Sequence, residues 1–383
     1  MEPTSYIELS ESALLKNFSY LRKLAGPNRT ISHVVKGNAY GHGIEQYVPL
    51  AYKLGARHFA TFDAREAYRV KQILPAEIPV MIMGMIDDHQ LEWAIQHEVE
   101  FFVFNFERLH KCIEFAKKWS KKPRIHIELE TGMNRTGFDD ANRKKLVEIL
   151  KANKDLLALK GFCTHYAGAE NYANFLRIEH QIQRFAQQKQ MLEKQGLFPE
   201  KYHTACSAAS IRMPQTRMDM VRIGILQYGF WPSKETYITT IQPNNLENKD
   251  PLHRVISWKS RIMSIKEVPQ GEYVGYGTSF LTSYHMKIAT VPVGYGHGFS
   301  RSLSNTGRAL VNGERVQVAG TVNMNLIMLD VTNLSVEIGD EVVLIGTQNG
   351  HTISVSSFSE YSDQLNYELL TRLPLDIPRH VVD

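Results

Sequence analysis

The sequence predicts an α/β protein, in which an N-terminal (β/α)8 barrel of the TIM type is followed by a C-terminal, mostly-β domain. Short apolar runs alternate with amphipathic stretches, and the alternation repeats eight times within roughly two hundred residues. Such a repeat favours a closed parallel barrel over an open doubly wound sheet. Beyond residue 255 the apolar runs are short and are separated by turn residues, which is typical of a compact β domain.

The N-terminal elements follow one another in a regular order. A strand is predicted at 6–9, and Ser10 can cap the helix that comes next. The eight barrel strands are predicted at 31–35, 58–62, 79–84, 100–105, 124–130, 158–165, 202–206 and 218–224. Helical patterns lie between them, for example at 44–54, 106–119 and 171–194.

The C-terminal part of the chain has shorter elements. Prolines and asparagines interrupt a stretch of about twenty residues, from Pro232 to Pro251, which is predicted to be a linker. Strands are predicted at 255–265, 288–292, 308–311, 316–322, 327–331 and 341–345, with a hairpin turn at 311–314. A final helix is predicted at 356–373, because Tyr361, Leu365 and Leu369 recur near helical spacing.

Length and composition fit two domains. A chain of 383 residues suits one large domain and one smaller one. We expect the barrel domain at 8–240 and the β domain at 241–383, with the strand at 1–7 packed on the β domain. An apolar content of 43% with 22% charged residues is that of a globular protein with a substantial core.

Composition also excludes several classes of protein. No window approaches the roughly 18 consecutive apolar residues of a membrane span, and the start lacks the regions of a signal peptide, so we expect a cytoplasmic protein. The three cysteines match no disulfide framework and no zinc pattern, so no metal is expected. With a net charge of +4, the basic cluster at 117–124 fits a solvated helix end better than a nucleic-acid surface.

Lys36 is the first candidate functional residue. Residues 34–43 read Val-Val-Lys-Gly-Asn-Ala-Tyr-Gly-His-Gly, so this lysine lies where a buried strand stops and a glycine-rich turn begins. Apolar neighbours that desolvate the lysine disfavour its ammonium form, and such a lysine can form a Schiff base. The same pattern also fits a surface lysine before a turn. Reacting groups of (β/α)8 barrels, however, come from the carboxyl ends of strands.

Further motifs follow other predicted strands. Residues 131–138 read Thr-Gly-Met-Asn-Arg-Thr-Gly-Phe, residues 164–167 read Thr-His-Tyr-Ala, and residues 220–225 read Met-Val-Arg-Ile-Gly-Ile. Together with the Lys36 segment they resemble, in the same order, motifs of the alanine racemase family, whose members bind pyridoxal 5′-phosphate (PLP) on a (β/α)8 barrel. The resemblance extends from Tyr6 to Arg379. The family usually has alanine where this chain has Gly37.

The resemblance implies which residues bind the cofactor ring. Lys36 would hold the PLP aldehyde, Arg135 would reach its phenolic oxygen, and His165 would pack on the ring. Glu128 stands where many family members have a carbamylated lysine that orients the arginine. A glutamate could orient Arg135 directly through a charge-assisted hydrogen bond.

The resemblance also implies a phosphate site. Ser207 lies at a helix start, where a hydroxyl and backbone N–H groups bind anions. Gly224 and Ile225 would offer further N–H groups to the same phosphate. Tyr40 would add a hydroxyl, and Tyr367, in the family's Asn-Tyr-Glu motif at 366–368, would bind the phosphate or gate the site.

Arg222 carries the most information on mechanism. The resemblance implies that it faces the pyridine nitrogen of PLP, where aminotransferases place a carboxylate. Because an arginine stays cationic, it donates to an unprotonated nitrogen and disfavours a pyridinium. The ring is then a weaker electron sink, which favours return of the proton to the substrate Cα and hence racemisation.

Racemisation needs a proton donor on each face of the substrate Cα. Lys36 can serve one face. Tyr276, in the Gly-Tyr-Gly segment at 275–277, resembles the second base of the family, which reaches the active site of the other subunit. The resemblance therefore implies a homodimer with shared active sites. A phenol of pKa ~10 must be brought closer to neutrality to act as a base, and His165 and Arg222 could do this.

The resemblance implies three substrate-binding residues, which are Arg135, Tyr295 and Met324. The chain departs from the family nearby, with His297 and Asn325 where aspartates are usual and Asn323 where cysteine is frequent. These changes bear on substrate identity more than on reaction type.

The function that the sequence predicts is a PLP-dependent racemase that interconverts L-alanine and D-alanine by a two-base mechanism and supplies D-alanine for peptidoglycan. One alternative is a broader racemase, or one for serine, lysine or arginine, on the same scaffold. A basic amino-acid decarboxylase is another, but Arg222 and the barrel-first domain order argue against it. A PLP-carrying protein without activity is the last, and it would need no Tyr276.

Overall fold

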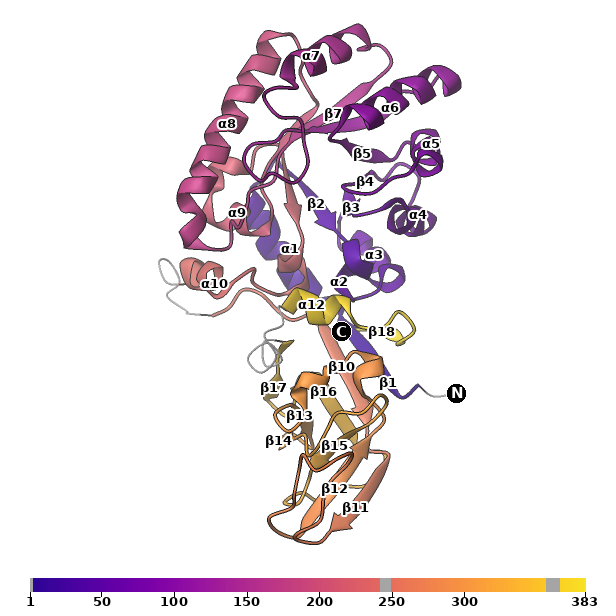
Figure 1. Cartoon of the computed structure of the whole chain (residues 1–383), viewed down its shortest axis with the longest axis vertical. Coiled ribbons are helices and arrows are strands. Elements are labelled where there is room, and N and C mark those ends of the chain that lie inside the picture. The colour runs from indigo at the N-terminus through magenta and orange to yellow at the C-terminus, as the bar shows by residue number, and fades with distance from the viewer. Residues whose placement is uncertain (1–2, 242–248, 356–365) are drawn as a thin grey trace. The chain divides into compact units, whose positions relative to one another are not determined.

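The structure is a computed structural model that describes residues 3–241, 249–355 and 366–383. Its chain forms two compact units. Residues 14–37 and 48–253 form one of them, which we call the barrel unit. Residues 1–13, 38–47 and 254–383 form the other, which we call the β unit. Figure 1 labels many of the elements of both.

The barrel unit contains the predicted parallel barrel. Its eight described strands are β2 (Thr30–Val34), β3 (Phe59–Thr61), β4 (Val80–Ile82), β5 (Glu100–Val103), β6 (Arg124–Glu128), β7 (Ala158–Cys163), β8 (Lys201–His203) and β9 (Met220–Ile223). They pair in the order β8-β7-β6-β5-β4-β3-β2-β9. Asp219 N–H donates to the Tyr202 carbonyl (3.1 Å) and Arg222 N–H to the Ala205 carbonyl (3.0 Å), so hydrogen bonds also join β8 to β9 and close the ring. The barrel and its eight predicted strands are confirmed.

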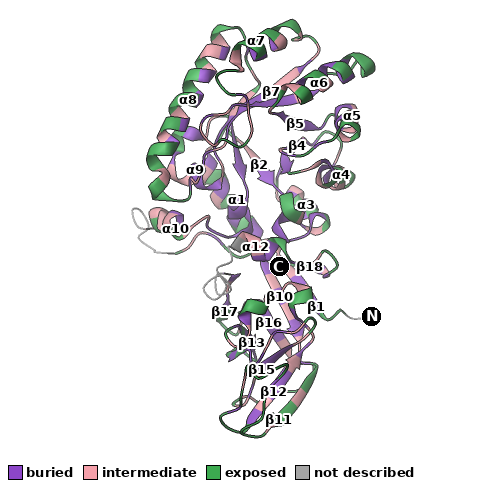
Figure 2. Ribbon diagram, viewed as in Figure 1, coloured by how far each residue is buried: buried purple, intermediate pink, exposed green. Residues whose placement is uncertain are grey.

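Helices pack outside this ring (Figure 1). They are α1 (Glu11–Ala25), α3 (Ile44–Lys53), α4 (Ala64–Ile73), α5 (Asp88–Gln96), α6 (Phe106–Trp119), α7 (Arg143–Ala152), α8 (Phe175–Lys194) and α9 (Ser207–Arg212). Side-chain caps begin several of them, since the Asp63, Asp87 and Asn105 side chains accept hydrogen bonds from the first turns of α4, α5 and α6. Figure 2 shows the strands mostly buried and the outer faces of the helices exposed, as amphipathic helices require.

One expectation for the region after the barrel is corrected. Within the predicted linker the structure has helix α10 (Lys234–Ile241). Its start is capped, because the Ser233 hydroxyl accepts a hydrogen bond from the Thr236 N–H group (3.2 Å). Ser233 is the sequence signal for the start of this helix, and the neighbouring prolines led to the prediction of a linker instead. Pro243 and the following asparagines of the predicted linker lie outside the described residues.

The β unit holds two sheets, in which all described strand pairs but one are antiparallel. The larger described sheet has the order β14-β13-β16-β10-β1-β18, with β17 beside β16. Its strands are β1 (Ser5–Ser10), β10 (Ile256–Arg261), β13 (Arg308–Val311), β14 (Glu314–Gln317), β16 (Glu341–Gln348), β17 (His351–Ile353) and β18 (Arg379–Val382). The smaller has the order β11-β12-β15, with β11 (Ser264–Val268), β12 (Met286–Val291) and β15 (Ile327–Asp330). β1 runs antiparallel to β10 and parallel to β18.

Local signals account for the details of this unit. Asn312 (φ 52°) and Gly313 (φ 87°) join β13 to β14 in the predicted hairpin turn. The predicted strand at 255–265 divides into β10 and β11, because the chain changes sheets between Arg261 and Ser264. The described end of the predicted last helix is α12 (Asn366–Thr371), while Tyr361 and Leu365 lie outside the described residues.

Across the described ranges, no helix combines the length and the apolar character needed to cross a membrane.

Acid pH should destabilise the barrel through His33. This histidine is buried on β2 beside Gln227 Oε1 (2.9 Å), and burial lowers the pKa of His33 from 6.5 to about 4. A depressed pKa contributes stability that is present above pH 6.5 and is lost as the pH falls toward 4. Between pH 7 and 5 the wild type should lose about 2 kcal/mol more unfolding free energy than His33→Gln. Urea unfolding of both proteins at the two pH values checks this, and equal pH dependence would contradict it.

Candidate active site

The predicted cofactor residues of the barrel unit lie at one end of the barrel, where parallel strands end. Lys36 follows β2, His165 follows β7, Ser207 begins α9 after β8, and Gly224 follows β9. Arg222 is the third residue of β9, and Arg135 lies in the loop after β6. The carboxyl ends of the strands are the reacting end of this architecture.

Electrostatic interactions show that four of these side chains gather. Burial, followed by the charges of Arg222, Arg135 and Lys36, lowers the pKa of His165 to about 3. A histidine with this pKa is neutral near pH 7. The sequence analysis took these four residues from separate motifs, and the barrel brings their charges within range of one another.

The Lys36 amine is held in a less basic state. Although part of its surface stays open to solvent, the surrounding barrel end desolvates the ammonium and lowers the pKa of Lys36. The Arg135 charge lowers this pKa further, while Glu66 and Cys206 raise it. At a given pH, more of the amine is therefore neutral than in an ordinary surface lysine.

The chain turns left-handed directly after Lys36. Gly37, Asn38, Ala39, Tyr40 and Gly41 all have positive φ, between 51° and 80°, in and just after the short element α2 (Lys36–Tyr40). Non-glycine residues visit this region singly and at a cost of about 1–2 kcal/mol each. Gly37, which replaces the family's usual alanine, removes that cost at one position. The Asn38 side chain accepts a hydrogen bond from the Ile44 N–H group (3.1 Å) at the start of α3.

Arg222 is buried, and its guanidinium is almost fully engaged. Nη1 donates to the Nδ1 atom and the carbonyl oxygen (2.8 Å) of His203, and Nη2 donates to the carbonyl oxygens of Thr164 (2.7 Å) and Thr204 (3.2 Å). Of its five N–H bonds, the Nε–H bond has no acceptor in the described part of the chain. Arg222 is therefore a fixed cation with one donor left for a ligand.

The expected contact between Glu128 and Arg135 is not made. No hydrogen bond or ion pair joins the two side chains where the structure describes them; instead Glu128 accepts a hydrogen bond from the Thr136 hydroxyl (2.7 Å). Burial raises the pKa of Glu128, against the opposing effects of Thr136, Arg135 and Arg222. The carboxyl group acts on Arg135 only through space, because its hydrogen bonding is satisfied by a closer neighbour.

Three of the residues predicted for the phosphate, Ser207, Gly224 and Ile225, meet at the junction of β9 and α9. The Gly224 N–H group donates to the Ser207 hydroxyl (2.9 Å), which ties the two segments together. Ile225 begins the 3-10 turn η3 (Ile225–Tyr228), so its N–H group has no acceptor within that turn. Ser207 is thus hydrogen-bonded to Gly224, and Ile225 is the next residue in the chain.

The β unit brings three other predicted segments together. Tyr295 and Gly296 donate their N–H groups to the Asn323 (3.0 Å) and Met324 (2.8 Å) carbonyl oxygens. The Thr321 hydroxyl donates to the Tyr276 carbonyl (3.4 Å), so the segment of the second candidate base lies beside them. The three predicted side chains are exposed, Tyr276 at 75%, Met324 at 57% and Tyr295 at 43%.

Two further predicted residues are also neighbours in the β unit. The rings of Tyr40 and Tyr367 have their centroids 6.0 Å apart at an angle of 51°. Each was predicted to contribute to the phosphate site from a different end of the chain. Their contact places residue 40, in the turn after Lys36, beside α12.

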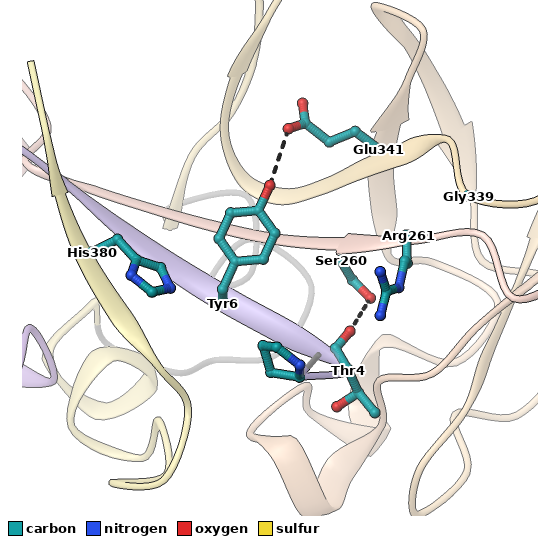
Figure 3. A pocket seen from close by; sticks show the side chains of 8 residues that line it. Thr4, Tyr6, Ser260, Arg261, Gly339, Glu341 and His380 are labelled. Atoms are coloured by element: carbon teal, nitrogen blue, oxygen red, sulfur yellow. Dashed lines mark hydrogen bonds between the residues drawn. The ribbon is translucent and has the colours of Figure 1, made fainter. Parts of the chain in front are cut away.

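A pocket elsewhere in the β unit contains none of the predicted residues. It has a volume of about 350 Å³ and is lined by Pro3, Thr4, Tyr6, Ser260, Arg261, Gly339, Glu341 and His380. Figure 3 shows the Tyr6 hydroxyl donating to Glu341 (3.4 Å) and the Ser260 hydroxyl donating to the Thr4 carbonyl (2.7 Å). These hydrogen bonds are internal to the sheet.

Sequence reasoning missed a set of buried polar residues inside the barrel. Glu100, His126 and His203 lie on β5, β6 and β8, are almost fully buried, and are hydrogen-bonded in a row to Arg222. The available signal was a charged or imidazole side chain within an otherwise apolar strand, such as glutamate before Phe-Phe-Val at 101–103.

Comparison with known families matches nearly the whole chain. Residues 9–232 match the family described as alanine racemase, N-terminal domain, and residues 255–381 match the family described as alanine racemase, C-terminal domain. An alanine racemase of Leptospira interrogans is 34% identical over 382 residues, which cover 99% of this chain and 96% of that protein. Alanine racemase 1 of Caldanaerobacter subterraneus is 33% identical over 377 residues, covering 97% of this chain and 93% of its own.

Solved structures agree with these relatives. An alanine racemase from Bacillus anthracis with bound L-Ala-P has a TM-score of 0.89 at 30% identity and covers 100% of this chain and 96% of its own. The enzyme from Streptomyces lavendulae has a TM-score of 0.91 at 27% identity, covering 100% and 98%. The enzyme from Bartonella henselae, solved with covalently bound pyridoxal phosphate, has a TM-score of 0.84 at 25% identity and covers 100% of both chains.

The turn after Lys36 should tolerate no side chain at Gly41. A Cβ atom there would lie 1.9 Å from the Leu370 carbonyl oxygen, and φ is +80°. Gly41→Ala should therefore cost more than about 3 kcal/mol of unfolding free energy. Gly271→Ala is the matched control, because φ is +86° there and nothing lies within 4 Å. Gly271→Ala should cost only the strain of a left-handed backbone at a residue with a side chain, about 1–2 kcal/mol. Equal losses of unfolding free energy in the two variants would refute the steric account.

The low basicity of Lys36 should depend partly on Arg135. Since the Arg135 charge lowers the pKa of Lys36, Arg135→Gln should move the pH midpoint of Lys36 acylation upward in the protein without cofactor. Mass spectrometry of proteins labelled briefly at a series of pH values measures this midpoint. Arg57→Gln, a change on the exposed side of the barrel, should leave it where it is in the wild type. An unshifted midpoint in Arg135→Gln would show that the charge does not act on the amine.

Proposed function

This chain belongs to the alanine racemase family, and on that premise we propose that it interconverts L-alanine and D-alanine with PLP as its cofactor. The observation that carries the proposal is the pairing, at one barrel end, of an amine of lowered pKa with a buried guanidinium that keeps one free donor. A neutral amine is what a cofactor aldehyde requires, and a guanidinium with a free donor suits an unprotonated ring nitrogen.

The donor set fits PLP. Lys36 would hold the aldehyde carbon, and Arg222 would donate from Nε to the ring nitrogen. Arg135, for which the described residues provide no hydrogen-bond acceptor, would meet the phenolic oxygen. The Ser207 hydroxyl and the Ile225 N–H group would bind the phosphate, together with Gly224, Tyr40 and Tyr367. His165, neutral near pH 7, suits packing against an aromatic ring.

The electrostatics of the site favour racemisation. When bound, PLP supplies an aldehyde that links to an amine and a ring that withdraws electron density from the substrate Cα–H bond. Arg222 cannot lose its proton, so it opposes protonation of the atom to which it donates. A proton removed from Cα is then returned to Cα.

Two residues of the chain would move the proton. Lys36 Nζ, made less basic by its surroundings, takes a proton from one face of Cα and returns it there. The Tyr276 oxygen would do the same on the opposite face, taking a proton as the phenolate and returning one as the hydroxyl. When one group removes the Cα proton and the other group returns a proton to the opposite face, the configuration at Cα is inverted. No other atom is transferred.

Exposure supports a shared site in a homodimer. Tyr276, Tyr295 and Met324 are all substantially exposed in the single chain, which is unusual for residues that touch a substrate. We propose that a second copy of the chain covers them. Each barrel then receives Tyr276 of the partner subunit.

The departures from the family near Tyr295 have local roles. His297 Nδ1 accepts a hydrogen bond from the Gly294 N–H group (3.2 Å) and closes the 3-10 turn η4 (Tyr295–His297). The Asn323 amide contacts the Met328 sulfur (3.9 Å). The His297 side chain supports the backbone of its turn and the Asn323 amide contacts a neighbouring side chain, so neither gives a specific reason to prefer serine or a basic amino acid over alanine. A role in supplying D-alanine for peptidoglycan and a cytoplasmic location are typical of the family and stay predictions for this chain.

The direct test is racemisation in D2O. The purified protein with PLP and L-alanine should form D-alanine, with one deuterium at Cα of the product. Chiral chromatography with mass detection measures both quantities. L-lysine and L-serine serve as competing substrates, and CO2 release without D-alanine would favour a decarboxylase instead.

Replacing the second base should separate exchange from inversion. Tyr276→Phe should lower racemisation by at least about 10²-fold, because proton transfer on one face is lost. Exchange of the Cα proton should persist for the one enantiomer whose proton faces Lys36. Tyr273→Phe, at another exposed tyrosine nearby, should behave as wild type. Loss of exchange for both enantiomers would contradict the assignment of faces.

Mixing two inactive variants should restore activity if the sites are shared. Lys36→Ala and Tyr276→Phe, refolded or co-expressed together, form mixed dimers in which one of the two sites has both wild-type residues. Activity should recover to about a quarter of the wild-type value, since half of the dimers are mixed and each has one intact site. Light scattering measures the dimer. No recovery from a mixture that is dimeric would mean that each subunit builds its own site.

A further inference from the structure

A row of buried polar side chains runs from Arg222 into the barrel interior. Arg222 Nη1 contacts His203 Nδ1, His203 Nε2 lies 2.8 Å from His126 Nδ1, and His126 Nε2 lies 3.0 Å from Glu100 Oε2. These four side chains come from β9, β8, β6 and β5. None exceeds 5% exposure, so the hydrogen bonds are shielded from water.

The row ends in a carboxylate with several partners. His58 Nε2 lies 3.2 Å from the same Glu100 oxygen, and the Ser32 hydroxyl lies 3.0 Å from His58 Nδ1. Lys160 Nζ lies 4.0 Å from the other carboxylate oxygen and also pairs with Glu200. Each of His126, His58 and Lys160 can therefore give Glu100 a hydrogen bond or a positive charge.

The two ends of the row allow only one arrangement of protons. Arginine has no acceptor, so His203 Nδ1 must accept and the ring proton must be on Nε2. That proton is donated to His126 Nδ1, and His126 must then carry its own proton on Nε2. This proton points at a carboxylate, which only accepts. All the hydrogen bonds therefore run in one direction, from the guanidinium to Glu100.

The charges of the groups agree with this direction. Burial on its own would raise the pKa of Glu100, but hydrogen bonds from His126 and His58 hold it well below its ordinary value. Burial lowers the pKa of His126 and takes that of His203 well below 6.5. Both imidazoles are neutral, and the net charges of the row are the cation at one end and the anion at the other.

We propose that Glu100 is a positioning residue for Arg222, acting through the fixed tautomers of His126 and His203. The carboxylate orients two neutral imidazoles so that each presents an acceptor toward Arg222, and the guanidinium is held with its Nε–H bond free. The effect on catalysis rests on the proposed function, in which the Nε–H group of Arg222 donates to the cofactor. The arrangement of protons along the row is independent of the proposed function.

Two other roles for the row, metal binding and simple packing of the core, explain these residues less well than the positioning of Arg222 does. In the described part of the chain, no group of three or more His, Cys, Asp or Glu side chains could hold a metal ion. If these residues only packed the barrel interior, branched apolar side chains would be expected there, as is usual in such barrels. A buried carboxylate and imidazoles cost desolvation, and such departures from an apolar core are expected at functional sites.

Gly161 permits the central hydrogen bond of the row. The pairing of β6 with β7 shifts by one residue between Ile125 and His126, so His126 faces Gly161 and not Lys160. A Cβ atom on Gly161 would lie 2.2 Å from His126 Nδ1 and 2.8 Å from His203 Nε2. Gly161→Ala therefore separates the two rings without changing any member of the row.

The first experiment reads the protons directly. Protein labelled with 15N-histidine and kept free of cofactor is studied by 15N NMR at pH 7, with signals assigned by their loss in His126→Gln and His203→Gln. Both histidines should show a protonated Nε2 and an unprotonated Nδ1. A proton on Nδ1 of either histidine, or a doubly protonated ring, would overturn the proposal whether or not the protein is a racemase.

The second experiment breaks the row in the holoenzyme. Gly161→Ala should lower kcat for L-alanine by about tenfold, which is the rate equivalent of losing one neutral hydrogen bond, and should leave KM within about twofold. The His203 signal should change in the same variant. Gly196→Ala, at a loop glycine with φ +76° and open space around it, controls for lost stability and should change neither. Normal kcat in a variant with a changed His203 signal would overturn the positioning role.

The third experiment removes only the charge. Glu100→Gln has an oxygen that can accept from both histidines, so the tautomers should persist. A neutral amide accepts more weakly than a carboxylate, so the imidazoles and Arg222 are held less firmly and kcat should fall by about tenfold. Wild-type kcat in this variant would show that the carboxylate charge does not reach Arg222. If the wild type itself showed no racemase activity, the proposed function would fail and the NMR result would still decide the proton arrangement.

Discussion

The guanidinium of Arg222 is the constraint on which the rest of the site depends. It is a buried charge, and such a charge is tolerated only where its donors are satisfied. Four of its N–H bonds are used by His203, Thr164 and Thr204, all from neighbouring strand ends. The closure of the barrel between β8 and β9 is what brings these acceptors to one point. A barrel opened at this seam would leave the charge unpaired.

A second constraint acts on the turn that follows β2. The backbone after Lys36 is left-handed over five residues, which is costly unless the surroundings hold it. The Arg379 side chain donates to the Gly41 carbonyl from Nε (3.0 Å) and Nη2 (2.9 Å), and the close approach of Leu370 excludes any residue but glycine there. The lysine is thus carried by a turn that tertiary contacts keep in place, which is how functional residues are commonly positioned.

The fold was largely predictable because its signals are local. Eight βα alternations and the Asn312-Gly313 turn each depend on a short stretch of sequence, and all are confirmed. What sequence could not supply was the pairing of distant residues. Glu100, His126 and His203 are each single polar residues in apolar strands, and only barrel closure makes them neighbours.

The same limit explains the errors at the site. The contact expected between Glu128 and Arg135 was taken from the family resemblance, but in the structure Glu128 accepts its hydrogen bond from the Thr136 hydroxyl. Helix α10 was hidden by nearby prolines. The domain boundary at 240 and 241, the shared site of a dimer and the individual roles of the site residues depend on contacts between parts of the molecule, so they stay predictions.

The central claim is that a permanent cation keeps the cofactor ring from becoming a strong electron sink. The most direct measurement is 15N NMR of the holoenzyme reconstituted with PLP labelled at its ring nitrogen. The account predicts an unprotonated nitrogen at pH 7, and a nitrogen that becomes protonated when Arg222 is replaced by glutamate. A protonated ring nitrogen in the wild-type enzyme would contradict the account.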